Sequence, residues 1–179
     1  MGVNVNAWIP NKFDLEAVGV LPSVLNQMCP GPEVWIWDEG DSRKTKPWAW
    51  EVLPTRETIG DGLCSIHGPG LMIHVYPRVM TVWSLARWWG FLQYQDLRNR
   101  VRNATTKIMQ ALGTTEVIWL PDWALETISP EGEAVTIESL RSYLNTDWGP
   151  PQALNSIDDE VLRLAEQSSP QVWFDERLS

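Results

Sequence analysis

The clearest alternation of apolar and polar positions lies in the middle of the chain. Two short runs rich in strand-forming residues, 63–67 and 72–76, flank a segment that contains Gly-Pro-Gly, and this order predicts a β-hairpin. If residues 68–71 form the loop, Ser65 lies opposite His74, because side chains alternate between the two faces of a strand. One face, expected to be core, then carries Cys64, Ile66, Ile73 and Val75, and the other carries Ser65, His67, Met72, His74 and Tyr76.

A helical pattern follows the hairpin. Asp96 is the expected N-cap of an amphipathic helix, because apolar residues recur after it at spacings of three and four as far as Leu112, and Gly113 is expected to end the helix. Ser84 is positioned to cap a shorter helix before it, over residues 85–89.

The remaining patterns predict a mixture of strands and helices. Residues 116–120 form a nearly continuous apolar run, which is typical of a strand buried on both faces. Residues 2–9 alternate apolar side chains with asparagine and predict an edge strand. Strands are also expected at 34–37 and 48–53, and helices are expected from Pro22, from Ile137 until Trp148, and at 157–165. The aromatic run 172–174 is expected to dock against the rest of the domain.

Together these elements predict an α+β fold. We expect a single domain over residues 1–179, with a mainly antiparallel sheet of about five to six strands and helices packed on one face. The C-terminal portion, from about residue 132, is expected to be helical and acidic. A chain of 179 residues with 44% hydrophobic content can bury a substantial core.

Charge is distributed unevenly along the chain. The net charge is −9; residues 41–113 carry five acids and ten bases (+5), whereas residues 114–179 carry thirteen acids and three arginines (−10). One interpretation is that the acidic C-terminal third folds beside the basic middle and neutralises it. The other is that a charged surface faces a partner. An acidic surface disfavours nucleic acid and anionic membranes and favours a basic protein.

The sequence also bears on cellular location. Cys29 and Cys64 are too few for a disulfide framework, so we expect reduced thiols. The N-terminal residues do not resemble a signal peptide, and no stretch approaches about eighteen apolar residues, so no membrane span is expected. We therefore expect a cytoplasmic protein.

No catalytic or metal-binding motif stands out. His67 and His74 lie diagonally on one face of the predicted hairpin, but no ligand spacing such as HExxH or paired CxxC accompanies them. Cys64 is expected to point toward the core, where a thiol is normally inert. We therefore predict no catalytic residue, no metal and no cofactor.

Four basic residues flank the apolar face of the predicted helix and are candidates for binding nucleic acid. They are Arg98, Arg100, Arg102 and Lys107. They could grip phosphates, but they border an apolar stripe that must be buried. Pairing with the C-terminal acids explains them more simply, so no nucleic-acid ligand is expected.

The lead hypothesis is a non-catalytic intracellular protein-interaction module, of the adaptor, inhibitor or immunity type, that binds a basic partner. Twelve tryptophans against three tyrosines and three phenylalanines favour it, because tryptophan is a frequent anchor of protein interfaces. Acidic and indole groups meet in the loop after the last predicted strand, which makes Asp122, Trp123 and Glu126 the expected binding residues. An alternative binding face would consist of Trp35, Trp37, Trp48 and Trp50.

The alternative hypothesis is an enzyme of unfamiliar type. Its site would lie where His67 and His74 meet a loop carboxylate such as Asp122. A deep pocket that gathers these three side chains would favour the enzyme, whereas a tryptophan-rich surface would favour the binding protein.

Overall fold

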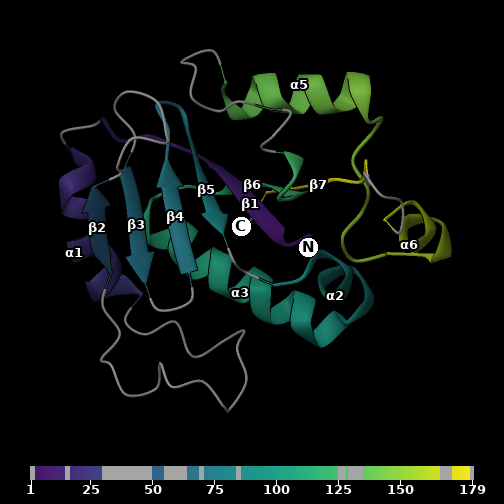
Figure 1. Cartoon of the computed structure of the whole chain (residues 1–179), viewed down its shortest axis with the longest axis horizontal. Helices are drawn as coiled ribbons and strands as arrows, with labels where there is room; N and C mark the ends of the chain where they lie inside the picture. Colours follow the sequence, from purple (N-terminus) through teal and green to yellow (C-terminus); the bar gives the residue numbers. More distant parts are fainter. Residues whose placement is uncertain are drawn as a thin grey trace.

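A computed structural model shows one antiparallel sheet with helices on both of its faces (Figure 1). The residues that it describes are 3–14, 17–29, 50–54, 64–68, 71–83, 86–124, 128, 135–165 and 171–177. At positions 52–54, 64, 67, 68 and 165 the description is limited to the backbone.

Within the described residues, seven strands lie in the order β2-β3-β4-β5-β1-β6-β7, and all neighbouring strands are antiparallel. The strands are β1 (Val5–Pro10), β2 (Glu51–Pro54), β3 (Cys64–Gly68), β4 (Leu71–Val75), β5 (Val79–Trp83), β6 (Glu116–Pro121) and β7 (Phe174–Arg177). The helices are the 3-10 helix η1 (Ala17–Val20), α1 (Leu21–Met28), α2 (Trp88–Gln93), α3 (Gln95–Ala111), α5 (Ile137–Asp147) and α6 (Asp159–Ala165). The predicted α+β class and antiparallel sheet are confirmed, with one strand more than the upper expectation of about six.

The apolar side chains of β1 divide between two layers of core. Val5, Ala7 and Ile9 pack with residues of α1, α2 and α3. Trp8 packs with α5, which lies on the opposite face of the sheet (Figure 1). The sequence led us to expect helices on one face. The second face is covered as well because Trp8 and Ile118 make its centre apolar.

β1 is an interior strand of the sheet and not its edge. It pairs with β5 on one side and with β6 on the other, and its residues from Val5 to Ile9 are all buried. The strand predicted over residues 2–9 is present as β1, but its expected position at the edge was wrong, because the asparagines at positions 4 and 6 suggested a solvent-facing side. Asn6 is only 1% exposed, so a polar residue occupies a deeply buried strand.

The predicted hairpin register is confirmed by β3 and β4. Ser65 pairs with His74, and the ladder continues one pair beyond the prediction, to Gly68 and Leu71. The fully buried residues of its core face are Ile66, Ile73 and Val75. The side chain of Cys64, expected on the same face, lies outside the described residues.

The segment after the hairpin differs most from the prediction. Residues 79–83 form β5, a strand that the pattern did not reveal. Its side chains are largely buried on both faces, and the strand begins only two residues after Pro77. The helix expected at residues 85–89 instead runs from Trp88 to Gln93 and contains Gly90.

α3 matches the predicted amphipathic helix. Val101 and Ile108 on its apolar face are fully buried, and Asp96 lies in its first turn rather than at its N-cap. Gly113 has a φ of 65°, a left-handed conformation that favours glycine and ends the helix as expected. Within the described ranges no helix, α3 included, is long and apolar enough to cross a membrane.

The C-terminal elements follow from local capping. The Thr136 side chain accepts a hydrogen bond from the Ser139 amide at 3.1 Å, and the Ser139 hydroxyl accepts one from the Thr136 amide at 2.8 Å, so α5 begins with a capping box. α6 begins at Asp159, two residues later than predicted, because the Asp158 carboxylate accepts from the Val161 amide. The final aromatic segment, expected only to dock, continues into β7 beside β6.

Arg141 ties α5 to the last two strands. Its guanidinium lies 2.6 Å from Asp175 and 3.1 Å from Glu116, and its pKa is raised chiefly by the hydrogen bond with Asp175. We expect Arg141→Met to lower the free energy of unfolding by about 2 kcal/mol, because two half-buried carboxylates lose their shared cation. Urea unfolding measures this, with the exposed Arg163→Met as control. Equal losses in both variants would contradict the role of Arg141.

Candidate interaction site

Two tryptophans from distant parts of the sequence stack near the end of α5. Trp123 lies in the turn that follows β6, and Trp148 directly follows α5. Their ring centroids are 5.1 Å apart, with 24° between the ring planes, and both residues are half-buried. Leu144 and Leu140 precede Trp148 by one and two helical turns and are buried. The packing of α5 therefore fixes where Trp148 lies.

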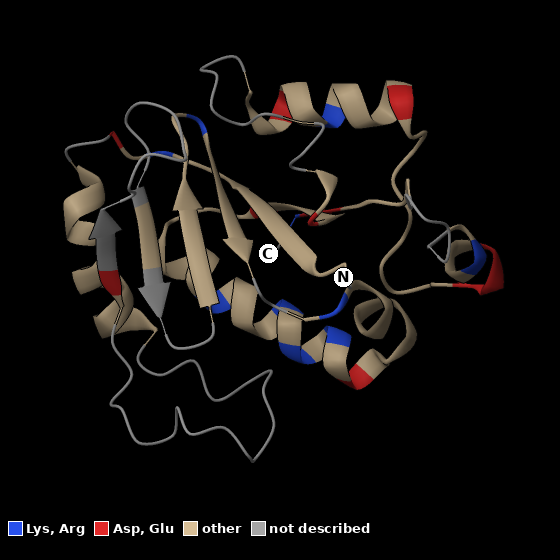
Figure 2. Ribbon diagram, viewed as in Figure 1, with Lys and Arg blue, Asp and Glu red and all other residues tan. Residues whose placement is uncertain are grey.

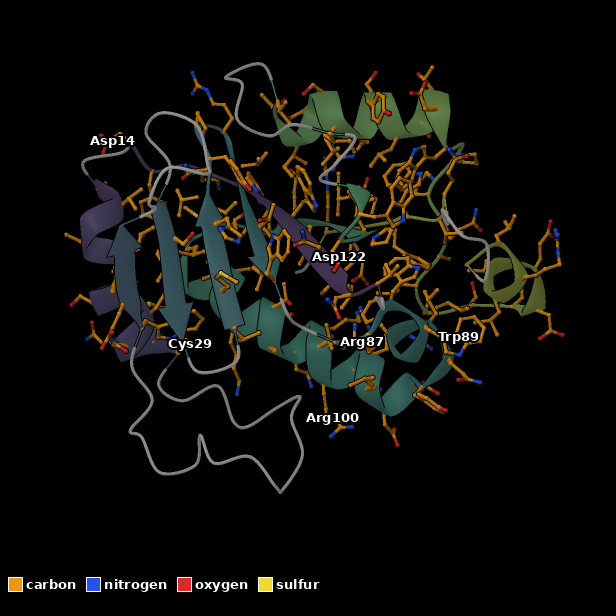
Figure 3. The ribbon with its side chains drawn as sticks, in the orientation of Figure 1. Asp14, Cys29, Arg87, Trp89, Arg100 and Asp122 are labelled. Carbon is orange, nitrogen blue, oxygen red and sulfur yellow. The ribbon has the colours of Figure 1, made fainter. Side chains whose placement is uncertain are left out.

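Asp122, next to Trp123 in sequence, is held in place by Asn4. Its carboxylate Oδ2 accepts a hydrogen bond from Asn4 Nδ2 at 2.9 Å, and its backbone N–H donates to the Asn4 carbonyl at 2.9 Å. Asn4 Oδ1 in turn accepts from Arg87 at 3.1 Å, and Figure 3 labels Asp122 and Arg87. The half-buried carboxylate of Asp122 therefore has a fixed position near the start of β1.

A second carboxylate lies at the end of α5. Asp147 is exposed and forms a hydrogen bond with Tyr143, one helical turn earlier. The pKa of Tyr143 is raised by burial first, and then by this hydrogen bond and the charge of Asp147. Tyr143 and Trp148 both pack on the core layer beneath α5. We define the acidic aromatic patch as Asp122, Trp123, Tyr143, Asp147 and Trp148.

The patch combines the groups that recognise a basic side chain. The face of an indole ring attracts Lys and, more often, Arg, and a carboxylate accepts charge-assisted hydrogen bonds from either. Half-buried tryptophans are also apolar anchors of the kind that dominate protein interfaces. A basic side chain can therefore stack on an indole while a neighbouring carboxylate neutralises it.

Part of the predicted binding set lies in this patch, namely Asp122 and Trp123. The predicted residues outside the described ranges are Glu126, Trp35, Trp37 and Trp48. Trp50 is only 1% exposed, and its indole N–H donates to the Cys29 carbonyl at 3.2 Å, so this indole fills the core and offers no surface to a partner. Burial raises the pKa of the Cys29 thiol, although Lys107 opposes the shift, which favours an unreactive thiol.

The hairpin residues of the enzyme hypothesis form a separate cluster. Ser65 Oγ and His74 Nδ1 are 2.7 Å apart, but Ser65 is only 3% exposed. The His74 ring lies edge-on to Trp83, with ring centroids 5.2 Å apart. This geometry pairs two polar side chains across neighbouring strands and leaves the hydroxyl covered.

Asp122 does not reach this cluster. His74 lies in the same row of the sheet as Trp8, two strands away, whereas Asp122 lies beside Asn4. Asn4 and Trp8 are four residues apart, about 13 Å along the chain, and each strand spacing adds about 5 Å across it. The structure therefore does not bring His74 and Asp122 together. The side chain of His67 lies outside the described residues.

A metal site can be tested directly. Among the described residues, no three His, Cys, Asp or Glu side chains gather closely enough to hold a metal ion. We expect purified protein to contain no stoichiometric zinc or iron, since a zinc site needs three or four such ligands. Elemental analysis tests this expectation. About one metal ion per chain, lost on His67→Ala or His74→Ala, would overturn it.

One basic flank of α3 is paired internally. Arg102 forms a 2.6 Å salt bridge with Glu176 of β7, and the Trp119 indole donates to the same carboxylate at 2.9 Å. Arg98 donates to carbonyl groups near the end of α2. The expected pairing of the basic middle with C-terminal acids is therefore present at this flank, which lies across the sheet from α5 (Figure 2).

Three residues of the patch were not singled out from the sequence. Tyr143, Asp147 and Trp148 were recognised only as parts of a predicted helix and its end. A signal existed for Trp148, which continues the four-residue spacing of Leu140 and Leu144. Its stacking partner could not be found in this way, because the contact depends on tertiary packing.

Comparisons with known proteins give no relative. No protein-family model, no curated protein and no solved structure matches this chain. Function must therefore be inferred from the chain's own residues.

Proposed function

We propose that this protein is a non-catalytic protein-interaction module, of the adaptor, inhibitor or immunity type, that binds a basic partner at the acidic aromatic patch. The observation that carries the proposal is the stacked pair of Trp123 and Trp148, which is half-buried and accompanied by the carboxylates of Asp122 and Asp147. Apolar anchors beside negative charge suit a partner that presents Arg or Lys side chains.

The tryptophan pair supplies affinity. Residues that dominate binding energies are most often Trp, Tyr and Arg in well-packed surroundings. Trp123 and Trp148 already support each other in the free protein, so docking a partner orders few additional rotamers. A preorganised pair of this kind binds more tightly than two independent indoles of the same area.

Charge supplies the preference for a basic partner. The carboxylates of Glu116, Asp175 and Glu176 are already paired with arginines. Asp147 and the acidic residues in the first turn of α6 are exposed, and Figure 2 shows the acidic part of α6 in red. With a net charge of −9, such carboxylates raise the association rate of a basic protein within a Debye length of about 8 Å.

Affinity capture from the native host tests this function. We expect a basic protein to bind the wild-type chain, to elute as salt rises, and to be lost with Trp148→Ala. Tyr94→Ala is the matched control, because Tyr94 is an aromatic residue 59% exposed outside the patch. A partner retained equally by all three proteins would contradict the site. Turnover of any compound in a host metabolite extract by the purified protein would contradict the non-catalytic assignment.

A further inference from the structure

Asn6 is a buried polar side chain on an interior strand of the sheet, and within the described residues it lacks a hydrogen-bond partner. It lies on β1 opposite Leu120 of β6 and is only 1% exposed. Among the described residues, neither its Oδ1 nor its Nδ2 has a hydrogen-bond partner. A buried amide almost always has a partner, either protein or water, because burying it without one is costly.

Trp8 brings a second unpaired group to the same face of β1. Residues 6 and 8 point to the same side of the strand. The Trp8 residue is fully buried, and its Nε1 has no acceptor within the described part of the chain. The indole N–H groups of Trp119 and Trp173 each have an acceptor, at 2.9 Å and 2.8 Å, whereas those of Trp88 and Trp123, like that of Trp8, have none among the described residues. Asn6 and Trp8 differ from the other residues with an unpaired buried group in that they are neighbours on one face of one strand, where a single partner can serve both.

We propose that Asn6 and Trp8 line a buried polar site, on the α5 side of the sheet, that holds a small neutral molecule. The occupant must accept hydrogen bonds from the amide and indole N–H groups and donate one to Asn6 Oδ1. Water, a hydroxyl compound or a carboxamide meets these requirements. A charged ligand does not, because neither residue supplies a counter-charge. This site is independent of the proposed protein interaction.

The neighbouring side chains restrict the occupant to a few heavy atoms. Leu120 and Ile118 lie opposite Asn6 and Trp8 on β6, and both are fully buried. Thr81, opposite Trp8 on β5, already accepts a hydrogen bond from another indole. The β-carbons of residues 6 and 8 are about 7 Å apart, so one small molecule or a pair of waters can contact both side chains.

A high-resolution crystal structure of the full chain tests the site. We expect density for water or a small molecule within about 3.2 Å of both amide atoms of Asn6. An empty space there, or an Asn6 bonded to a protein group, would overturn the proposal. Mass spectrometry of the denatured protein separates the two sources of the occupant. A compound of definite mass that is lost in Asn6→Leu identifies a metabolite, and its absence beside observed density identifies water.

Asn6→Leu also provides a solution test. We expect it to lower the urea midpoint, because the bound molecule and its hydrogen bonds are lost. Asn103→Leu, at an exposed position of α3, is the matched control and should leave the midpoint nearly unchanged. A higher midpoint for Asn6→Leu would overturn the proposal, because removing a truly unpaired buried amide stabilises a protein. If Asn6→Leu fails to fold, the wild-type crystal structure decides.

Discussion

Replacing Val101 or Ile108 of α3 with aspartate is expected to unfold the protein. Both residues are fully buried in the core layer between α3 and the sheet. An unpaired charge at such a site costs about 3–5 kcal/mol or more, which is comparable to the whole stability of a typical domain, about 5–15 kcal/mol. Far-UV circular dichroism and urea unfolding measure the loss.

Asn103→Asp is the matched control for this test. Asn103 lies on the same helix and is exposed, so its replacement should change the free energy of unfolding by no more than about 0.5 kcal/mol. A Val101→Asp protein as heat-stable as the wild type would show that the buried face of α3 is wrongly assigned.

Trp123→Ala is expected to weaken binding of the captured partner by about 2 kcal/mol or more, which is roughly thirty-fold in Kd. The substitution removes one indole of the stacked pair and leaves the other without support. Trp148→Ala should act similarly, and the double variant should lose less than the sum, because the two rings are in contact. Titration calorimetry measures the affinities, and melting temperatures check that each variant is folded.

Asp122→Asn is expected to slow association at low salt and to leave dissociation nearly unchanged. The new amide can still accept the hydrogen bond from Asn4, so the change removes charge with little loss of structure. Trp123→Ala and Asp122→Asn proteins that bind like wild type, together with a Trp48 variant that fails, would move the site to the alternative tryptophan face.

The hairpin shows what could be predicted from the sequence. Residues 64–68 and 71–75 alternate cleanly, and a slip of one residue would turn every apolar side chain away from the core. The register of Ser65 with His74 therefore followed from the pattern alone and is observed. α3 was equally predictable, because its apolar spacing and Gly113 agree on one helix.

The order of the strands in the sheet could not be predicted from the hydrophobic pattern of the sequence. Asn4 and Asn6 made β1 look like an edge strand with one solvent-exposed face. However, Asn6 is buried, and Asn4 forms a hydrogen bond with Asp122, which follows the neighbouring strand β6. β5 was missed for the opposite reason, because a strand buried on both faces shows little alternation. Polarity along a strand reports its two faces and says nothing about its neighbours.

Only part of the candidate site could be predicted from the sequence. Asp122 and Trp123 stood out because an acid and an indole end the most apolar strand of the chain. Trp148 comes to them through the packing of α5. Trp50 looked equally available in the sequence, but its indole hydrogen bond to Cys29 draws it into the core. Such contacts between distant segments are decided by tertiary structure.

Indole N–H signals in a ¹⁵N correlation spectrum test the proposed interaction most directly. The chain has twelve tryptophans, and each indole N–H gives one signal that substitution can assign. On addition of the captured partner, the signals of Trp123 and Trp148 should shift, less so as salt rises, while that of the buried Trp50 stays in place. Unchanged signals for Trp123 and Trp148, with shifts at other tryptophans, would contradict binding at the acidic aromatic patch.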